Sequence, residues 1–252
     1  NFEPGAAWHG YAGMAAGYAM VDPNKLMLLT PGIDRRSGEY GDFGVPATVV
    51  ANFLREQRIV PEKCDLNSIL FLMTPAEDES KLNTLIAKLV MFKALWDADA
   101  PLHQVLPSLY AANGERYAGA TIRSVCREMH AFYRSRDIKG LQRKCFRAES
   151  FPELAMLPQD AYRALVGNEV DYLPLDQCKG RIAATLALIY PPGIGVVVPG
   201  ERWDERAQPM LDYLHAFEES FNRFPGFNYE VQGVFQERVD GRIVFHTYVV
   251  RE

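Results

Sequence analysis

One carboxylate stands out among the side chains that could bind a substrate. Glu62 lies in the segment Ile59-Val60-Pro61-Glu62-Lys63, between a predicted helix and a short apolar run that is typical of a buried strand. A carboxylate held at the end of an ordered strand can bind a cationic group through charge-assisted hydrogen bonds. The alternative is an exposed glutamate beside an exposed lysine. Composition alone favours that alternative, because both residue types are usually exposed.

A second group of polar residues follows the same apolar run. Thr74 and Glu77 come directly after it, where they could face a cleft at the end of the strand. Glu77, Asp78 and Glu79 also precede the clearest helical pattern in the sequence. Negative charge at the amino end of a helix stabilises it by roughly 0.3–1 kcal/mol. Helix capping is therefore the preferred explanation for this acidic cluster.

Residues 123–147 are locally basic, and aromatic side chains are interleaved among them. The favoured interpretation is a solvated helix face. The alternative is a site for a phosphate-bearing effector or for an acidic subunit surface, with Arg123 and Arg127 as the candidate contacts. The basic residues of the stretch are Arg123, Arg127, Arg134, Arg136, Lys139, Arg143, Lys144 and Arg147.

Several familiar catalytic and metal-binding motifs are absent from the sequence. It holds no GxGxxG or Walker motif and no GxSxG nucleophile elbow. Its five histidines form no HExxH or HxH pair, and we expect His130 and His215 to be surface or core-edge residues. Its four cysteines form no CxxC, so reduced thiols in a cytoplasmic protein are the favoured interpretation. None of its eight lysines lies in a Ser-x-His-Lys arrangement, so no catalytic lysine is nominated.

The first hundred residues alternate between strand-like and helical patterns. The spacing predicts a strand over 18–29 with a break at Asp22-Pro23, a helix over 45–57, a buried strand over 68–73 and an amphipathic helix over 82–96. This order is typical of a layer of sheet covered by helices. The pattern breaks at 97–101, where we place a domain boundary.

The remaining residues predict a second set of helices and strands. The expected elements are a helix over 122–133 with Thr121 as its N-cap, a short helix over 158–166, strands over 181–190 and 195–199, a helix over 208–224, and a hairpin of strands 231–237 and 242–250 that turns at Asp240-Gly241. We therefore predict an α+β protein with domains at 1–100 and 101–252.

Length and composition limit the kinds of partner. The chain has 252 residues, enough for one to two domains. Its 27 basic and 32 acidic residues give a net charge of −5, which argues against a general nucleic-acid binder. Its apolar runs are shorter than the ~18 residues of a membrane helix, and no signal-peptide pattern is present. We expect no nucleic-acid or membrane partner and a cytoplasmic location. Because the chain starts at Asn1 rather than Met, we also expect it to be a piece of a longer protein.

Seven ordered segments together resemble the carboxyl-terminal part of the bacterial ornithine/lysine/arginine decarboxylases. The segments are Trp8-His-Gly10, Asp22-Pro-Asn-Lys-Leu26, Thr30-Pro-Gly-Ile33, Asp42-Phe-Gly-Val-Pro-Ala47, Ile59-Val-Pro-Glu-Lys63, Tyr190-Pro-Pro-Gly193 and Phe224-Pro-Gly-Phe227. This resemblance covers essentially the whole chain. It implies that residues 1–100 belong to an aminotransferase-like small domain and that residues 101–252 form the family's own carboxyl-terminal α+β domain.

The resemblance also implies a cofactor and oligomeric assembly. Family members use pyridoxal 5'-phosphate, and their Schiff-base lysine lies in an upstream domain that this chain lacks. No catalytic residue is therefore expected in this fragment, and the isolated piece should be inactive. The family forms homodimers that assemble into larger rings, and some members bind guanine nucleotides, a role that the basic stretch 123–147 could serve.

The resemblance points to a substrate as well. Residues 64–77 and 106–113 look most like ornithine decarboxylase. Glu62 is similar in position to the residue that binds the distal ammonium of the substrate in the ornithine and lysine enzymes. The implied reaction converts L-ornithine to putrescine and CO₂, in polyamine biosynthesis or in an acid response. Lysine decarboxylation is the alternative, since one methylene is worth only about 1–3 kcal/mol of discrimination. A non-catalytic assembly or nucleotide-binding module is the alternative from another class.

Overall fold

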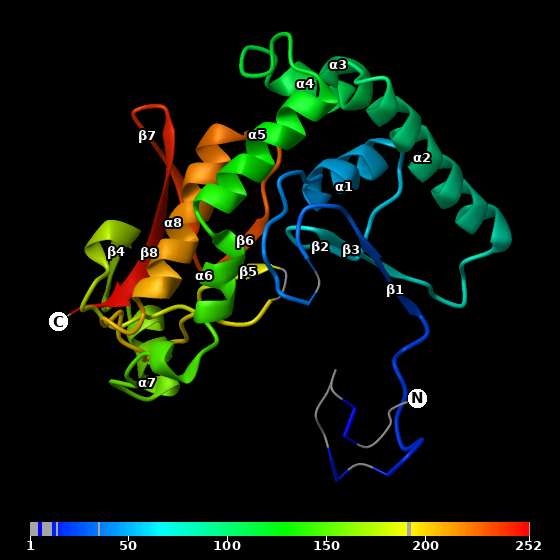
Figure 1. Ribbon diagram of the computed structural model, residues 1–252. Helices are drawn as coiled ribbons and strands as arrows, with labels where there is room; N and C mark the ends of the chain where they lie inside the picture. Colours follow the sequence, from blue (N-terminus) through cyan, green and yellow to red (C-terminus); the bar gives the residue numbers. More distant parts are fainter. Residues whose placement is uncertain (1–4, 7–11, 14, 35, 191–192, 252) are drawn as a thin grey trace.

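The computed structural model describes residues 5–6, 12–13, 15–34, 36–190 and 193–251. These residues form a mixed arrangement of three small antiparallel sheets and the helices that cover them (Figure 1). The predicted α+β class is confirmed. The Trp8-His-Gly10 segment lies outside the described residues.

The amino-terminal sheet has the strand order β1-β3-β2, with β1 at Lys25–Leu29, β2 at Lys63–Cys64 and β3 at Ser68–Leu72. Helix α1 (Ala47–Glu56) packs against it and buries most of its residues. The predicted buried strand over 68–73 is confirmed. The strand predicted over 18–29 is much shorter, because the Asp22 side chain accepts a hydrogen bond from the backbone N–H of Asn24 and forms a turn before β1.

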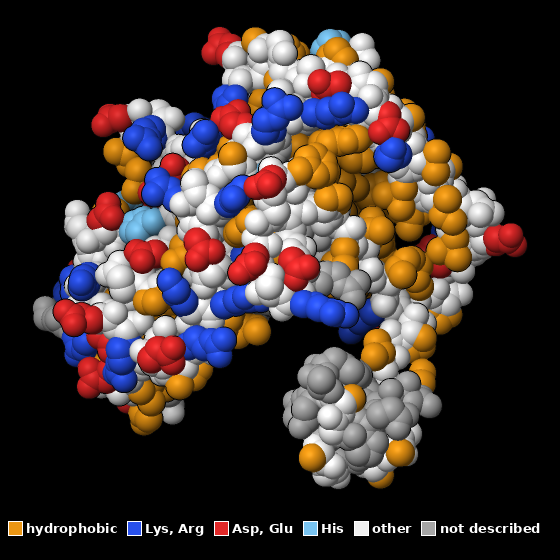
Figure 2. Space-filling model, in the orientation of Figure 1, with side chains coloured by type: hydrophobic (Ala, Val, Ile, Leu, Met, Phe, Trp, Pro, Cys, Tyr) orange, Lys and Arg blue, Asp and Glu red, His pale blue; other side chains and the backbone are white. Residues whose placement is uncertain are grey.

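Helix α2 (Glu79–Asp97) begins at the acidic cluster, as predicted. The Asp78 side chain caps it by accepting a hydrogen bond from the Lys81 backbone N–H at 2.8 Å. Although α2 is long, only Leu85 and Phe92 are buried. Figure 2 shows hydrophobic side chains gathered beside this helix. Its exposed apolar residues are Leu82, Ile86, Val90 and Met91.

Four helices follow α2 along the chain: α3 (Leu102–Val105), α4 (Pro107–Ala112), α5 (Ile122–Ser135) and α6 (Ile138–Lys144). The apolar pattern predicted α5 but not the short helices α3, α4 and α6. Thr121 caps α5 as expected, and it forms a reciprocal capping box with Ser124. Helix α5 buries an almost continuous face, so it is a central element of the core.

The carboxyl-terminal sheet has the order β4-β8-β7 and packs against helix α8 (Gln208–Arg223). Its strands are β4 (Val170–Pro174), β7 (Phe235–Val239) and β8 (Arg242–Val250). Two more strands, β5 (Leu188–Tyr190) and β6 (Glu230–Gln232), form a separate ribbon. The remaining elements are α7 (Pro158–Val166) and the single-turn helices η1 (Ala148–Ser150) and η2 (Leu175–Gln177).

Three strand predictions in this half are wrong. The predicted strand 231–237 is split into β6 and β7 at Gly233, whose φ of +70° takes the backbone out of strand geometry. The strands predicted over 181–190 and 195–199 reduce to β5 and to isolated bridges, which join Ile182 to Arg202, Ala183 to Val249 and Ala187 to Val197. Strand β4 was not predicted. The predicted hairpin turn at Asp240-Gly241 is confirmed, since it joins β7 to β8.

One main hydrophobic core runs through both halves of the chain, from Val45 to Val249. Its largest fully buried side chains are aromatic, with Trp203 and Tyr117 first among them. The four cysteines are buried and unpaired, as expected. Among the described residues, no helix is long and apolar enough to cross a membrane. The domain boundary near residue 100 stays a prediction.

Candidate functional site

Glu62 lies immediately before β2, at a cavity where the two halves of the chain meet. Its backbone N–H donates to the Leu70 carbonyl of β3 at 2.9 Å, and its side chain is exposed. The cavity has a volume of about 100 Å³. Its lining comprises Thr48, Arg55, Glu62, Lys63 and Cys64 from the first half and Tyr190, Asn228, Tyr229 and Glu230 from the second. The sequence had located Glu62, but not the residues of the second half that face it.

The Glu62 carboxylate is available to a ligand. Within the described part of the chain, it has no ion pair or side-chain hydrogen bond. The neighbouring cations are engaged elsewhere: Arg55 donates to the Asn52 side chain at 3.2 Å, and the Lys63 ammonium lies 5.4 Å from the centre of the Tyr190 ring. A free carboxylate beside a cavity suits an ammonium group, which it can bind by a charge-assisted hydrogen bond.

The cysteine beside this cavity is not a nucleophile. Burial raises the pKa of the Cys64 thiol to about 12, so the thiol stays protonated at neutral pH. The thiols of Cys145 and Cys178 are in the same state, because burial also raises the pKa of each to about 12. The geometry of the Glu62 cavity therefore supports binding of a cation rather than thiolate chemistry.

Thr74 and Glu77 lie apart from Glu62. They form a turn beyond the end of β3, in which the Glu77 backbone N–H donates to the Thr74 carbonyl at 3.0 Å. The Glu77 carboxylate forms an ion pair with Lys81 at 3.3 Å. Glu77 lines a different groove of about 530 Å³. The structure therefore does not bring the three predicted substrate-binding residues together, and the roles of Thr74 and Glu77 stay predictions.

Arg123 and Arg127 differ sharply, although both lie on α5. The Arg123 guanidinium donates to the Trp96 carbonyl at 2.8 Å and to the Asp97 carbonyl at 2.7 Å, and it lies over the Trp96 ring. It therefore fixes the last turn of α2. Arg127 is exposed, and its side chain has no hydrogen bond or ion pair within the described ranges. Both arginines line a cleft of about 870 Å³, together with Phe43, Trp96 and Arg134.

The rest of the basic stretch is more than a solvated helix face. Its side chains attach α5 and α6 to other segments of the chain. The contacts are Arg134 with Asp42 at 2.9 Å, Arg136 with Glu219 at 2.5 Å, Lys139 with Asp65 at 3.8 Å, and Arg143 with the Ser37 carbonyl at 2.7 Å. Three side chains of the stretch, those of Arg127, Lys144 and Arg147, have no hydrogen bond or ion pair within the described ranges. Only Arg127 of these lines the cleft of about 870 Å³, so it is the clearest candidate for an anionic ligand.

His130 is buried rather than at the surface or the core edge, so that expectation is wrong for this residue. Only 4% of it is exposed, and its Nε2–H donates to the Gly41 carbonyl at 2.8 Å. Gly44 lies against the ring, and a Cβ at that position would be 2.1 Å from Nδ1. His130 therefore packs the loop before α1 onto α5, and it needs a glycine at position 44.

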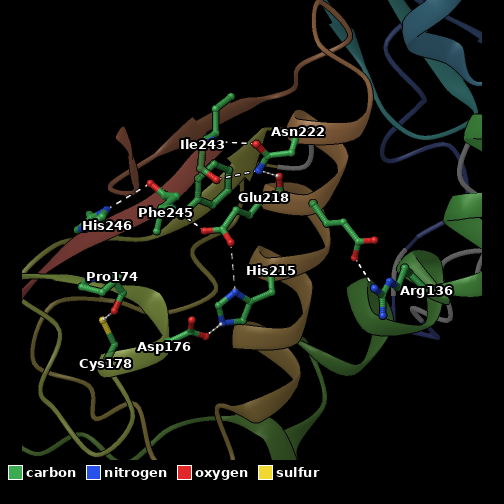
Figure 3. A network of polar contacts seen from close by, with 12 residues as sticks. Arg136, Pro174, Asp176, Cys178, His215, Glu218, Asn222, Ile243, Phe245 and His246 are labelled. Atoms are coloured by element: carbon green, nitrogen blue, oxygen red, sulfur yellow. Dashed lines mark hydrogen bonds and ion pairs between the residues drawn. The ribbon is translucent and has the colours of Figure 1, made fainter. Parts of the chain in front are cut away.

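His215 belongs to a polar network that the sequence pattern did not reveal (Figure 3). Its Nε2 lies 3.2 Å from Asp176, and a hydrogen bond to Glu218 is the main reason that its pKa is raised. Glu218 also accepts a hydrogen bond from the Phe245 backbone N–H at 2.5 Å, and Asn222 bonds the backbone of Ile243. The three α8 residues of this network, at positions 215, 218 and 222, share one face. Glu218 and Asn222 tie α8 to β8, and His215 ties it to η2.

Pyridoxal phosphate does not fit the residues of this chain. The group needs a lysine held in a pocket to form its covalent link. All eight lysines are described, and none is buried. Of the three half-buried lysines, Lys63 lies against Tyr190 and Lys139 bonds Gln142, while Lys88 lies on α2. No group of three or more potential metal ligands occurs among the described residues either.

Comparison with known proteins identifies the family and agrees with the fold. The family description "Orn/Lys/Arg decarboxylase, major domain" matches residues 1–81, and "Orn/Lys/Arg decarboxylase, C-terminal domain" matches residues 139–251. The inducible ornithine decarboxylase of Escherichia coli is 53% identical over 251 residues, which is 100% of this chain and 34% of that protein. The inducible ornithine decarboxylase of a Lactobacillus species is 50% identical over 244 residues, which is 97% of this chain and 33% of that protein.

A solved structure extends the agreement to three dimensions. Lysine decarboxylase A from Pseudomonas aeruginosa superposes with a TM-score of 0.89 at 37% identity, over 99% of this chain and 33% of that one. The chain thus spans about a third of the length of the relatives it matches. The chain belongs to the Orn/Lys/Arg decarboxylase family, because two models of that family match it, a member is 53% identical over the whole chain, and another shares its fold.

Proposed function

We propose that this chain is the substrate-recognition part of an ornithine decarboxylase that converts L-ornithine to putrescine and CO₂. The observation that carries the proposal is the Glu62 carboxylate, which faces a cavity without an ion-pair partner among the described residues. The relatives named ornithine decarboxylases support the choice of substrate, since they are 53% and 50% identical in sequence, against 40% for a lysine decarboxylase of Pseudomonas aeruginosa. Lysine remains the alternative substrate.

The decarboxylation itself requires groups beyond this chain. Pyridoxal phosphate, when bound, supplies the electron sink for the carbanion left by the departing CO₂. Because no lysine here is buried, the proposal places the cofactor on residues outside this chain. The part left to this chain is to bind the distal ammonium of the substrate at Glu62 and so to fix the orientation of the substrate.

The complete protein is further proposed to form an oligomer, to be cytoplasmic and to have a domain limit near residue 100 of this chain. The exposed apolar side chains on α2, such as Ile86 and Val90, favour association with another protein surface, as in a homodimer that builds a larger oligomer. Four buried, unpaired cysteines favour a cytoplasmic location. Residues 1–100 and 101–252 would be the two domains, and the proposed limit falls between the two family matches.

A second candidate function is effector binding in the cleft beside α5. We propose Arg127 as the principal contact for a guanine nucleotide, because its guanidinium is free, whereas that of Arg123 bonds the end of α2. Phe43 and Trp96 supply aromatic surface in the same cleft. Titration of a guanine nucleotide should show saturable binding that Arg127→Ala weakens. Unchanged binding in Arg127→Ala and in Arg123→Ala would refute this assignment.

The main proposal is tested in the complete decarboxylase that contains this chain. We expect a higher kcat/KM for ornithine than for lysine. Glu62→Gln should raise KM for ornithine about 10- to 100-fold, since hydrogen bonds to charged groups contribute roughly 1.5–3 kcal/mol. Glu79→Gln removes an exposed carboxylate from the first turn of α2 and serves as the control. An unchanged KM in Glu62→Gln would refute the proposal. The same assay on Thr74→Ala and Glu77→Gln tests their predicted contacts.

A further inference from the structure

Glu62 and Lys63 carry opposite charges and line the same small cavity, yet they do not pair. Opposite charges that share a cavity attract each other. No carboxylate oxygen in the described part of the chain lies within 4.0 Å of the Lys63 ammonium. The ammonium instead lies over the face of Tyr190, 5.4 Å from the ring centre. The Tyr190 ring therefore takes the place that a carboxylate would otherwise fill.

The position of the Tyr190 ring is fixed by the backbone around it. Tyr190 is the last residue of β5 and pairs with Glu230 of β6, so the ribbon sets where the side chain starts. Gly193 lies against the ring with a φ of +73°, and a Cβ there would be 2.6 Å from Cδ2 of Tyr190. Any larger residue at position 193 would move the ring. The ribbon thus presents a preformed aromatic face to Lys63.

An aromatic face attracts an ammonium through its quadrupole without neutralising a nearby carboxylate. We propose that Tyr190 is a positioning residue: its ring holds the Lys63 ammonium away from Glu62, so that the carboxylate stays open to the distal ammonium of the substrate. This inference rests on the proposed function, in which Glu62 is the substrate contact. Without the ring, the Lys63 ammonium would compete with the substrate ammonium for the same carboxylate. The carboxyl-terminal half would in this way control specificity at a residue of the amino-terminal half.

The test uses the complete decarboxylase and separates KM from kcat. Tyr190→Leu should raise KM for ornithine about twofold to fivefold with kcat unchanged, which is the effect expected from one exposed ion pair. Tyr190→Phe keeps the ring face and should keep the wild-type KM. Adding Lys63→Met to Tyr190→Leu should restore KM, because the competing ammonium is gone. If Tyr190 had only a structural role, adding Lys63→Met would not restore KM.

Two results would overturn the inference: an unchanged KM in Tyr190→Leu, or a raised KM that Lys63→Met does not restore. If Tyr190→Leu does not fold, as judged by circular dichroism, Gly193→Ala displaces the ring without removing it. That variant should give the same rise in KM and the same rescue. Glu62→Gln distinguishes failure of the proposed function from failure of the proposed role of Tyr190. If Glu62→Gln leaves KM unchanged, the proposed function fails; if only the Tyr190 variants do so, this inference alone fails.

Discussion

Replacing Arg123 with methionine tests whether this arginine holds the fold together or awaits a ligand. Its guanidinium donates to two carbonyls in the last turn of α2, at 2.8 and 2.7 Å, and lies 5.7 Å from the Trp96 ring centre. Hydrogen bonds from a charged group contribute about 1.5–3 kcal/mol when they are buried. Arg123 is half-buried, and the freed carbonyls at the helix end would regain water. We therefore expect Arg123→Met to lower the free energy of unfolding by about 1–2 kcal/mol.

The matched control is Arg127→Met, one turn further along the same helix. The Arg127 side chain is exposed and has no hydrogen bond or ion pair in the described ranges, so its loss should change the free energy of unfolding by less than about 0.5 kcal/mol. Urea unfolding of the 252-residue chain, followed by tryptophan fluorescence, measures both variants. With a denaturant slope of about 3 kcal/mol per molar, the Arg123 midpoint should fall by roughly 0.5 M. Equal midpoints for the two variants would refute the structural role of Arg123.

Three further predictions concern the stability of the chain. Gly233→Ala should lower the free energy of unfolding by about 3 kcal/mol or more, because its Cβ would lie within bonding distance of the Leu186 carbonyl oxygen. Gly241→Ala is the control, since Gly241 has a similar φ but open space around it, and its free-energy loss should be about 1–2 kcal/mol. Similar urea midpoints for the two variants would contradict the explanation given for the β6–β7 break. The hydrogen bond to Glu218 raises the pKa of His215, so protonated His215 stabilises the fold fully below its unfolded pKa of about 6.5 and less as pH rises through its folded pKa. The wild type should therefore lose stability from pH 6 to 8 relative to His215→Gln. Parallel pH profiles of the unfolding midpoint in the two proteins would contradict this stabilising role. Phe92→Ala should lower the free energy of unfolding by about 3–5 kcal/mol, because Phe92 is buried. Val90→Lys, on the exposed face of the same helix, should change it by less than about 0.5 kcal/mol. A large loss in Val90→Lys would show that this face is covered in the isolated chain.

Elements with local signals were predictable from the sequence. Helix α7 runs from Pro158 to Val166 as predicted, because a proline suits its first turn and Gly167 follows its end. The β7–β8 turn was equally clear, since Asp240-Gly241 accepts the positive φ that the turn requires. In both cases, a few neighbouring residues decide the backbone conformation.

Features set by distant contacts were not predictable. The break at Gly233 depends on the backbone at Leu186, which closes over it from another part of the chain. The burial of His130 depends on the Gly41 carbonyl and on the space left by Gly44, neither of which its own helical pattern reveals. Spacing on a helix gives the face on which a residue lies, but not what another segment places against that face.

The candidate site likewise has one part that was predictable from the sequence and another part that only the structure reveals. The loop that carries Glu62 could be recognised from the sequence, since it lies between a helix and the apolar run of the buried strand β3. The contact between Lys63 and Tyr190 joins residues far apart in the chain, so only the fold reveals it. The separation of Glu77 from Glu62 also required the structure, because both lie near the same strand in sequence but face different grooves.

The central claim, that Glu62 recognises the distal ammonium of the substrate, is tested most directly by a cycle of two enzymes and two substrates. We would measure kcat/KM of the complete decarboxylase and of Glu62→Gln for ornithine and for 2-aminopentanoate, which lacks the distal ammonium. The account predicts that Glu62→Gln lowers kcat/KM for ornithine about 10- to 100-fold and leaves the value for 2-aminopentanoate nearly unchanged. An equal loss for both substrates, or no loss for ornithine, would contradict it.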